Sequence, residues 1–260
     1  MRVLILAPHF DDAVYSCGAL VSRRVAQGHT VVMMTVCGRA IPDQPPANRF
    51  VRELHARWRA ANGGELPDRQ AEDRAAAKAL SSSSSGSMAG RVQVIALPFL
   101  DAIYRCAEAG EALYPSGGQL NGTPHPQDSL PRQLRAKDWL AEMACEELYL
   151  PLAVGGHVDH RIVRDEALAA LTGRPELVAY AYADFPYSRR RVAVAEAVAR
   201  FPAGFSLLPG PSLPETEGEL LAKIAAMREY RSQNSSFWLD DAAMAAEVRA
   251  TAETYWRVCH

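Results

Sequence analysis

The chain has 260 residues, of which 48% are hydrophobic and 22% are charged, and its formal net charge is −2. These values indicate one large globular domain spanning residues 1–260, or a domain with a small appendage. The low net charge argues against nucleic acid, because phosphate binding needs a concentrated basic face. The basic run Arg189-Arg190-Arg191 is interpreted as a solvated helix start, with a site for an anionic substrate as the alternative.

No apolar run approaches the ~20 residues that a membrane span requires. The N-terminal stretch has too short an apolar region for a secretory signal, so we expect a cytoplasmic protein. The five cysteines form no CxxC pair and indicate no disulfide framework.

The first 36 residues have the pattern of a β-α-β unit. Arg2–Ala7 is a continuous apolar stretch, typical of a strand buried on both faces of a parallel sheet. A helical pattern follows over residues 14–27, where Gly28 would end it, and residues 30–36 are rich in β-branched side chains. The sequence therefore predicts a parallel sheet with a right-handed crossover.

The remaining chain continues to alternate. Helices are predicted over 50–61, 69–80, 132–145, 162–171, 217–230 and 241–254, and strands over 92–96, 147–150, 178–182 and 205–208. The serine-rich run at 81–87 is interpreted as a surface connection. Residues 98–131 form a long loop rich in Gly and Pro, which we expect to act as a lid or wall over a site. This alternation predicts an α/β fold.

Three polar residues directly follow the first strand: His9, Asp11 and Asp12. Open α/β sheets bind ligands beyond the carboxyl ends of their strands. Imidazole and carboxylate together suit a cation such as zinc. Asp11 or Asp12 could instead cap the following helix, but one N-cap explains only one of the three.

A second cluster, His157, Asp159 and His160, follows the strand predicted at 147–150. Asp159 could be a helix cap and His160 a first-turn residue. Both clusters are nevertheless expected at the same edge of one sheet, so together they predict a metal site.

These motifs, His9-Phe10-Asp11-Asp12 and His157-Val158-Asp159-His160, resemble those of the LmbE-like, or PIG-L-type, N-acetylglucosamine deacetylases. The resemblance implies a Rossmann-like, mostly parallel sheet flanked by helices. Residues 100–105 further resemble the branch that deacylates glycosylated antibiotics and related metabolites. Two positions depart from the family pattern: Phe10 replaces the usual Pro, and Ala13 replaces the usual Glu.

Carried over position by position, the resemblance implies that His9, Asp12 and His160 bind Zn²⁺, with Fe²⁺ as another candidate. Three protein ligands leave a coordination position for water. The resemblance further implies three catalytic residues. Asp11 would be the general base, His157 would stabilise the oxyanion, best as an imidazolium, and Asp159 would orient His157 or His160.

The outer matches imply contacts to the substrate. Arg69 and Asp101 are expected to contact sugar hydroxyls, and Arg105 to line the same loop. Lys223 and Tyr230 match a C-terminal signature and are expected to stabilise the closing helix. The predicted substrate is a small molecule, either an N-acyl amino sugar or a glycoconjugate that contains one. A metal-dependent phosphoesterase and a non-catalytic sugar-binding module remain alternatives, and the oligomeric state is open.

Overall fold

The computed structural model describes residues 1–82, 90–136, 138–211 and 214–259. Its centre is a seven-stranded sheet in the order β3-β2-β1-β4-β5-β7-β6, in which β7 runs opposite to the other six strands. The strands are β1 (Arg2–Ala7), β2 (Thr30–Thr35), β3 (Arg91–Ala96), β4 (Glu147–Pro151), β5 (Val178–Tyr182), β6 (Ser206–Pro209) and β7 (Tyr255–Cys259). The predicted α/β fold with a mostly parallel sheet is confirmed.

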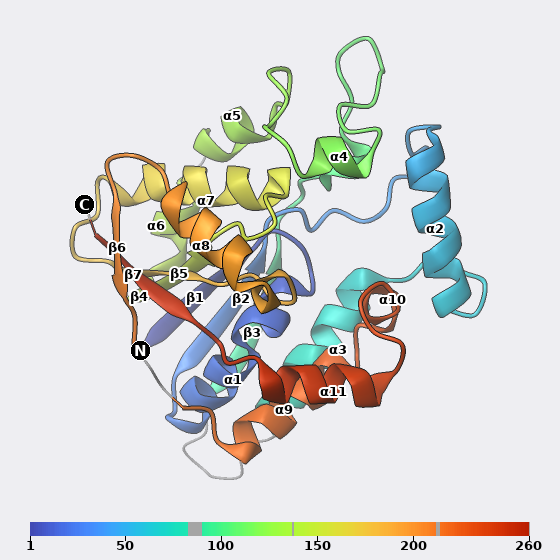
Figure 1. The fold of residues 1–260 in the computed structure, drawn as a ribbon. Coiled ribbons are helices and arrows are strands. Elements are labelled where there is room, and N and C mark those ends of the chain that lie inside the picture. The colour runs from blue at the N-terminus through green and yellow to red at the C-terminus, as the bar shows by residue number, and fades with distance from the viewer. Residues whose placement is uncertain (83–89, 137, 212–213, 260) are drawn as a thin grey trace.

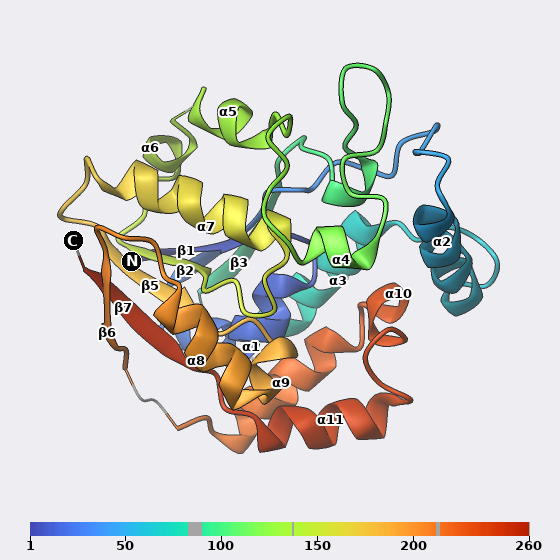
Figure 2. The same ribbon diagram turned by 45° about the horizontal axis from the view of Figure 1, so that its top comes forward.

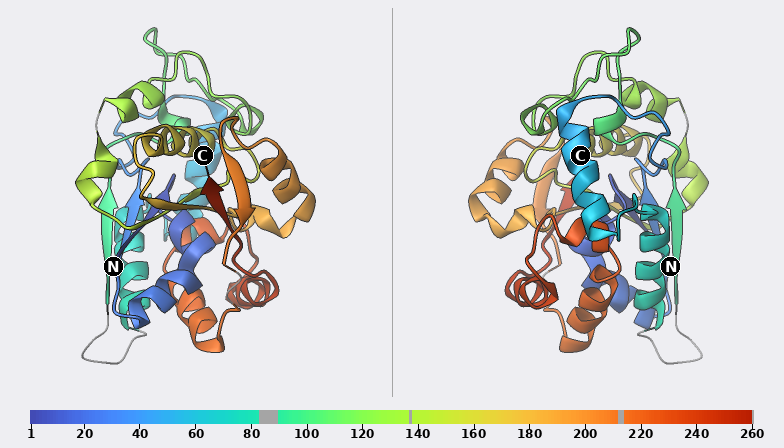
Figure 3. Two further views of the ribbon diagram at one scale, coloured as in Figure 1. Left: turned by 90° about the vertical axis from the view of Figure 1, so that its left-hand side faces the viewer. Right: turned by 90° about the vertical axis from the view of Figure 1, so that its right-hand side faces the viewer.

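Helices cover both faces of this sheet (Figures 1 and 3). One face carries α1 (Asp12–Ala26), α3 (Arg69–Ser82) and α9 (Glu217–Met227), with α11 (Asp241–Ala250) packed on α9. The other carries α5 (Leu130–Arg135), α6 (Trp139–Met143), α7 (Val158–Leu171) and α8 (Arg191–Ala199). Three further helices stand beyond the sheet, namely α2 (Arg49–Ala61), α4 (Gly117–Leu120) and α10 (Arg231–Asn234).

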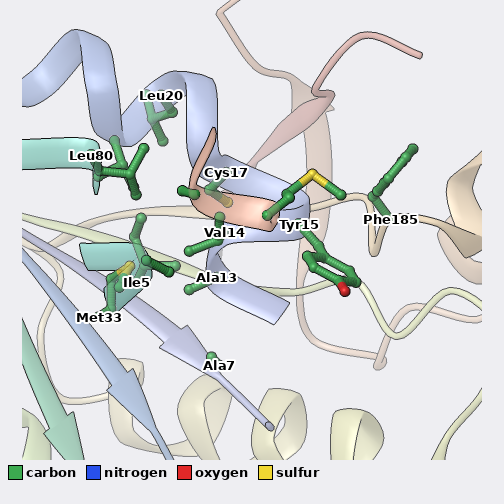
Figure 4. Close-up of a cluster of buried hydrophobic side chains, with 14 of the residues drawn as sticks. Ile5, Ala7, Ala13, Val14, Tyr15, Cys17, Leu20, Met33, Leu80 and Phe185 are labelled. Atoms are coloured by element: carbon green, nitrogen blue, oxygen red, sulfur yellow. The ribbon is translucent and has the colours of Figure 1, made fainter. Parts of the chain in front are cut away.

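The central strand β1 explains the two-sided core. Val3 and Ile5 face the α1 side, whereas Leu4 and Leu6 face the α7 side, and all four are essentially inaccessible to solvent. Because side chains alternate along a strand, a continuous apolar run fills both layers at once. Figure 4 shows the α1 side, where Ala13 lies among these apolar side chains. The family Glu position is therefore part of the core in this chain.

The order in which the chain adds strands to the sheet reverses between β1 and β4, which are parallel neighbours. Strands β2 and β3 lie on one side of β1, whereas β4 and β5 lie on the other. Adjacent loops that leave such a switch point in opposite directions open a crevice at the carboxyl ends of the strands. Helices α2, α4 and α10 stand at this end of the sheet (Figure 2). The two predicted polar clusters follow β1 and β4, so the topology brings them together.

Two segments differ from the sequence-based expectation. Residues 132–145 form two short helices rather than one, because Pro131 sits in the first turn of α5 and Asp138 caps a separate α6. The C-terminal helix ends at Ala250, and the chain continues into β7. Part of the predicted serine-rich connection, residues 83–87, lies outside the described residues.

The loop at 98–131 is folded against the body of the protein. It contains a 3₁₀ turn at Ala102–Tyr104 and the short helix α4, and it buries Leu113 and Tyr114. The Tyr114 hydroxyl donates to Asp128, which ties the middle of the loop to its C-terminal part. Within the described residues, no helix is both long and apolar enough to cross a membrane.

Candidate metal centre

The end of β1 and the start of α1 position the first cluster. His9 lies two residues after the strand, and its backbone N–H donates to Asp12 Oδ2 at 2.7 Å. Asp11 occupies the N-cap position of α1, but its side chain makes no capping hydrogen bond. The capping alternative therefore does not account for either carboxylate, and the Asp11 carboxylate remains available on the cleft side.

The loop after β4 positions the second cluster. Gly155 and Gly156 adopt φ values of +86° and +78°, a region that favours glycine, and they turn the chain into α7. His157 caps this helix, since its Nδ1 accepts from the Asp159 backbone N–H at 3.2 Å. The rings of His157 and His9 meet edge to face with centroids 5.0 Å apart. The two motifs, about 150 residues apart in the sequence, thus form one site.

Three donor atoms converge between the clusters. Asp12 Oδ2 lies 3.3 Å from His9 Nδ1 and 3.4 Å from His160 Nε2. Ligands of a tetrahedral zinc, each at about 2.0–2.1 Å from the ion, lie roughly 3.3 Å from one another. The donor atoms of His9, Asp12 and His160, the three residues that the family resemblance implies as ligands, therefore have a spacing that fits a divalent metal ion.

A second group, His9, Cys37 and Asp159, also has donor atoms within 4.8 Å of one another. It shares His9 with the first group, and Asp159 is already engaged by an ion pair with Arg105 and by the Ala102 backbone N–H. The first group is the better metal site, because it leaves none of its ligands committed to a cation of the protein.

Each histidine ligand is held through its other ring nitrogen by a buried carboxylate. Asp159 Oδ2 lies 2.9 Å from His9 Nε2, and Asp184 Oδ1 lies 2.6 Å from His160 Nδ1. Such carboxylate partners fix the tautomer of the imidazole and raise its basicity as a metal ligand. The structure places Asp159 on His9, whereas the sequence-based expectation was His157 or His160.

Asp184 is a site residue that the sequence reasoning missed. It follows β5 and also accepts the Val154 backbone N–H at 2.7 Å, so it ties the loop after β4 to the loop after β5. A signal was present, because Asp184 is an acidic residue directly after a predicted strand of the same sheet.

The charges of the centre suit a cation. Burial alone would raise the pKa of Asp12, but His160 and His9 lower it to about 2. Burial lowers the pKa of His160, yet Asp12 and Asp184 more than offset this and raise it. The negative charge of these carboxylates, which favours a proton on the imidazole, also favours a metal ion at this position.

The two catalytic candidates next to the ligands, Asp11 and His157, have pKa values shifted in opposite directions. Burial and the neighbouring Asp12 raise the pKa of Asp11 to about 6. Burial and the neighbouring His9 lower the pKa of His157 to about 4, so the environment favours a neutral imidazole over the expected imidazolium. Since Nδ1 of His157 accepts a hydrogen bond, the proton of the neutral ring lies on Nε2.

Arg69 and Asp101 lie at the edge of the centre. The Arg69 guanidinium lies between the rings of Phe10 and Trp58, 5.6 and 5.4 Å from their centroids. Its terminal nitrogens are 3.6 Å from Asp11 Oδ1 and 3.6 Å from Asp101 Oδ2. Phe10, which replaces the usual Pro, therefore supplies one of the surfaces that hold Arg69.

Arg105 lies elsewhere than expected. It is 7% exposed and pairs with Asp159 and Asp128 behind the metal ligands, and it does not line the cleft. The C-terminal signature packs as expected, because Lys223 pairs with Glu253 at 2.9 Å and Tyr230 donates to Asp73 at 2.6 Å.

A cleft of about 310 Å³ opens over the metal ligands. Asp11, Arg69, Asp101 and His157 all line it. Its two walls are largely apolar: one comes from α2, the 3₁₀ turn and α4, and the other from the loops around α10 and after β5. The wall residues include Phe50, Leu54, Trp58, Ile103 and Leu120 on the first side, and Phe185, Tyr187 and Phe237 on the second.

Comparison with known proteins agrees with this geometry. The model of the PIG-L family, described as GlcNAc-PI de-N-acetylase, matches residues 4–171, which include both motifs. A 2'-N-acetylparomamine deacetylase of Niallia circulans is 30% identical over 71% of this chain and 66% of that protein, just under two thirds of its length. Its namesake from Streptomyces fradiae is 27% identical over 89% of this chain and 73% of that protein.

Solved structures give the same result over the full length. The zinc inhibited form of a teicoplanin deacetylase superimposes with a TM-score of 0.75 at 27% identity, covering 100% of this chain and 98% of that one. A pseudoaglycone deacetylase superimposes with a TM-score of 0.70 at 28% identity, covering 99% and 97%. The predicted family resemblance and the assignment as an N-deacetylase are confirmed: the chain belongs to the PIG-L family of de-N-acetylases.

Proposed function

We propose that this enzyme uses a divalent metal ion, zinc or Fe²⁺, to remove an N-acetyl or other N-acyl group from an amino sugar of a glycosylated small molecule. The observation that carries the proposal is the convergence of His9, Asp12 and His160 beside the carboxylate of Asp11, which lines the cleft. The names of the relatives support the substrate class, because they act on N-acetylparomamine and teicoplanin. A cytoplasmic location stays a prediction from the sequence.

In this proposal His9 Nδ1, Asp12 Oδ2 and His160 Nε2 hold the metal. A bound zinc ion would supply a Lewis acid for the carbonyl group and would lower the pKa of water toward ~7. Asp11 takes a proton from the attacking water and gives it to the departing nitrogen, which leaves only as an amine. The Nε2–H of His157 donates a hydrogen bond to the oxygen on which negative charge develops.

Arg69 and Asp101 position the base and the sugar. The Arg69 guanidinium faces the Asp11 carboxylate and favours its anionic, proton-accepting form. Asp101 lines the cleft and offers an acceptor for a sugar hydroxyl. Arg105 holds Asp159, and through Asp159 it holds His9, so we assign it a positioning role in place of the expected substrate contact.

A hydrolysis assay tests the proposal directly. The metal-loaded enzyme is expected to release acetate from N-acetylated amino-sugar glycosides and to leave phosphate esters intact. A chelator should abolish turnover, and Zn²⁺ and Fe²⁺ added back separately identify the better metal. Turnover of phosphate esters alone would favour the phosphoesterase alternative, and sugar binding without turnover would favour the binding module.

The apolar walls predict a preference for a bulky or apolar group next to the sugar. Leu54→Ala and Phe50→Ala are expected to raise KM for such a conjugate by about 5–30-fold, because each removes roughly 1–2 kcal/mol of apolar contact. The kcat should change little, since neither residue is a proposed metal ligand or catalytic group. Leu239→Ala is the matched control, because Leu239 is 95% exposed and does not line the cleft. Equal KM values in all three variants would show that the walls do not contact the substrate.

A further inference from the structure

A second, strongly basic groove lies next to the metal centre. It has a volume of about 250 Å³ and runs between α7 and α8, which lie side by side in Figures 1 and 2. Four arginines line it, namely Arg161, Arg164, Arg190 and Arg200. The one acidic side chain in the lining is that of Glu196. The whole chain has a net charge of −2, so this concentration of positive charge is local.

Two of these guanidiniums are not neutralised by the protein. Arg164 lies 2.8 Å from Asp165, and Arg200 lies 3.9 Å from Glu196. Arg161 and Arg190 have no carboxylate within ion-pair distance in the described part of the chain. Burial and the charges of Arg164 and Arg200 hold the pKa of Arg161 below its usual value. An anion in the groove would relieve this repulsion.

The groove is held by contacts on its inner side. Arg164 is 8% exposed, donates to the Leu152 backbone carbonyl at 3.3 Å, and lies over the Phe201 ring. A Cβ atom at Gly156 would come within 2.8 Å of Arg161 Nη2, so glycine leaves the room in which this guanidinium lies against the loop. Guanidiniums offer paired N–H donors that match the oxygens of a carboxylate, phosphate or sulfate, and Arg164 is held in place at the inner side of the groove.

The groove shares its border with the catalytic cleft. Gly155 and Gly156 line the groove and directly precede His157, which lines the cleft. Asn121, at the end of α4, lines both. We propose that this groove is an oxyanion-binding site that takes a carboxylate, phosphate or sulfate group at the edge of the catalytic cleft. The group is either an acidic substituent of the substrate or a free anion.

Sulfate titration of the metal-loaded enzyme by calorimetry tests the site itself. We expect one saturable site outside the metal centre that weakens at least about tenfold in Arg161→Gln/Arg190→Gln, because two charge-assisted interactions are lost. The control Arg132→Gln/Arg191→Gln removes the same charge from exposed positions outside the groove, and it should bind sulfate as the unaltered enzyme does. Equal binding by both double variants, or no saturable binding by the unaltered enzyme, would overturn the proposal.

Enzyme kinetics then distinguish an acidic substituent of the substrate from a free anion, and this second test rests on the proposed function. The substrates are an N-acetylated amino-sugar glycoside that carries a carboxylate and its methyl amide. If the anion belongs to the substrate, Arg161→Gln/Arg190→Gln raises KM for the acid alone, and sulfate competes with the acid alone. If a free anion binds, sulfate changes the rate on both substrates, and the double variant loses this response. A lack of hydrolysis of either compound would contradict the deacylase function, while the sulfate titration would still decide on the groove.

Discussion

Asp11→Asn is expected to keep the metal and to lower kcat by about 10²–10⁴-fold, whereas Asp12→Asn is expected to lose the metal itself. Asp11 lies beside the ligands without belonging to them, and its amide analogue keeps the shape but accepts no proton. Asp12 Oδ2 lies between the two histidine nitrogens, so a neutral amide there removes the anionic ligand. Metal content and kcat, measured on the same preparations, separate the two roles.

Excess metal sharpens this comparison. Part of the activity of Asp12→Asn should return at high Zn²⁺ concentration, because its defect lies in the affinity for the metal. The activity of Asp11→Asn should not return. Metal loss in Asp11→Asn together with full metal in Asp12→Asn would mean that the roles are reversed. Full metal and full activity in both variants would contradict the mechanism.

The pH profile gives a second readout of the base. A general base works when deprotonated, so kcat/KM should fall as the pH drops through the pKa of Asp11, which burial and Asp12 raise to about 6. A bound divalent cation moves this limb to lower pH. Asp11→Asn should lose the acidic limb, and a limb that persists unchanged in this variant would assign the base to another group.

Asp184→Asn is expected to weaken metal binding by about 10–100-fold although Asp184 is not a ligand. Its carboxylate holds His160 Nδ1 at 2.6 Å and the Val154 backbone N–H at 2.7 Å. An amide keeps one acceptor but removes the negative charge that makes the imidazole a better donor to the metal. The dissociation constant can be measured by competition with a chromophoric chelator.

The comparison variants for Asp184 are available in the same chain. Asp159→Asn should weaken metal binding similarly through His9, whereas Asp43→Asn, at an exposed carboxylate outside the centre, should leave it unchanged. At saturating metal, Asp184→Asn should recover most of its kcat, because the catalytic groups remain in place. Unaltered metal affinity in Asp184→Asn would show that this carboxylate does not support His160.

The sequence alone determined the layered fold and the two His/Asp clusters that form the candidate metal centre. The continuous apolar run Arg2–Ala7 can only be buried on both faces, which requires a parallel sheet between two helix layers. The carboxyl ends of parallel strands meet at one edge, so the His/Asp motifs after the first and fourth strands had to approach one another. Both inferences rest on local patterns.

Only the tertiary structure decided which residue supports which ligand. The contact of Asp159 with His9, the contact of Asp184 with His160 and the burial of Arg105 all depend on how side chains from separate loops pack together. Strand β7 was missed for a related reason. Its five residues carry too short a pattern, and their stability comes from pairing with β5 and β6 rather than from local propensity.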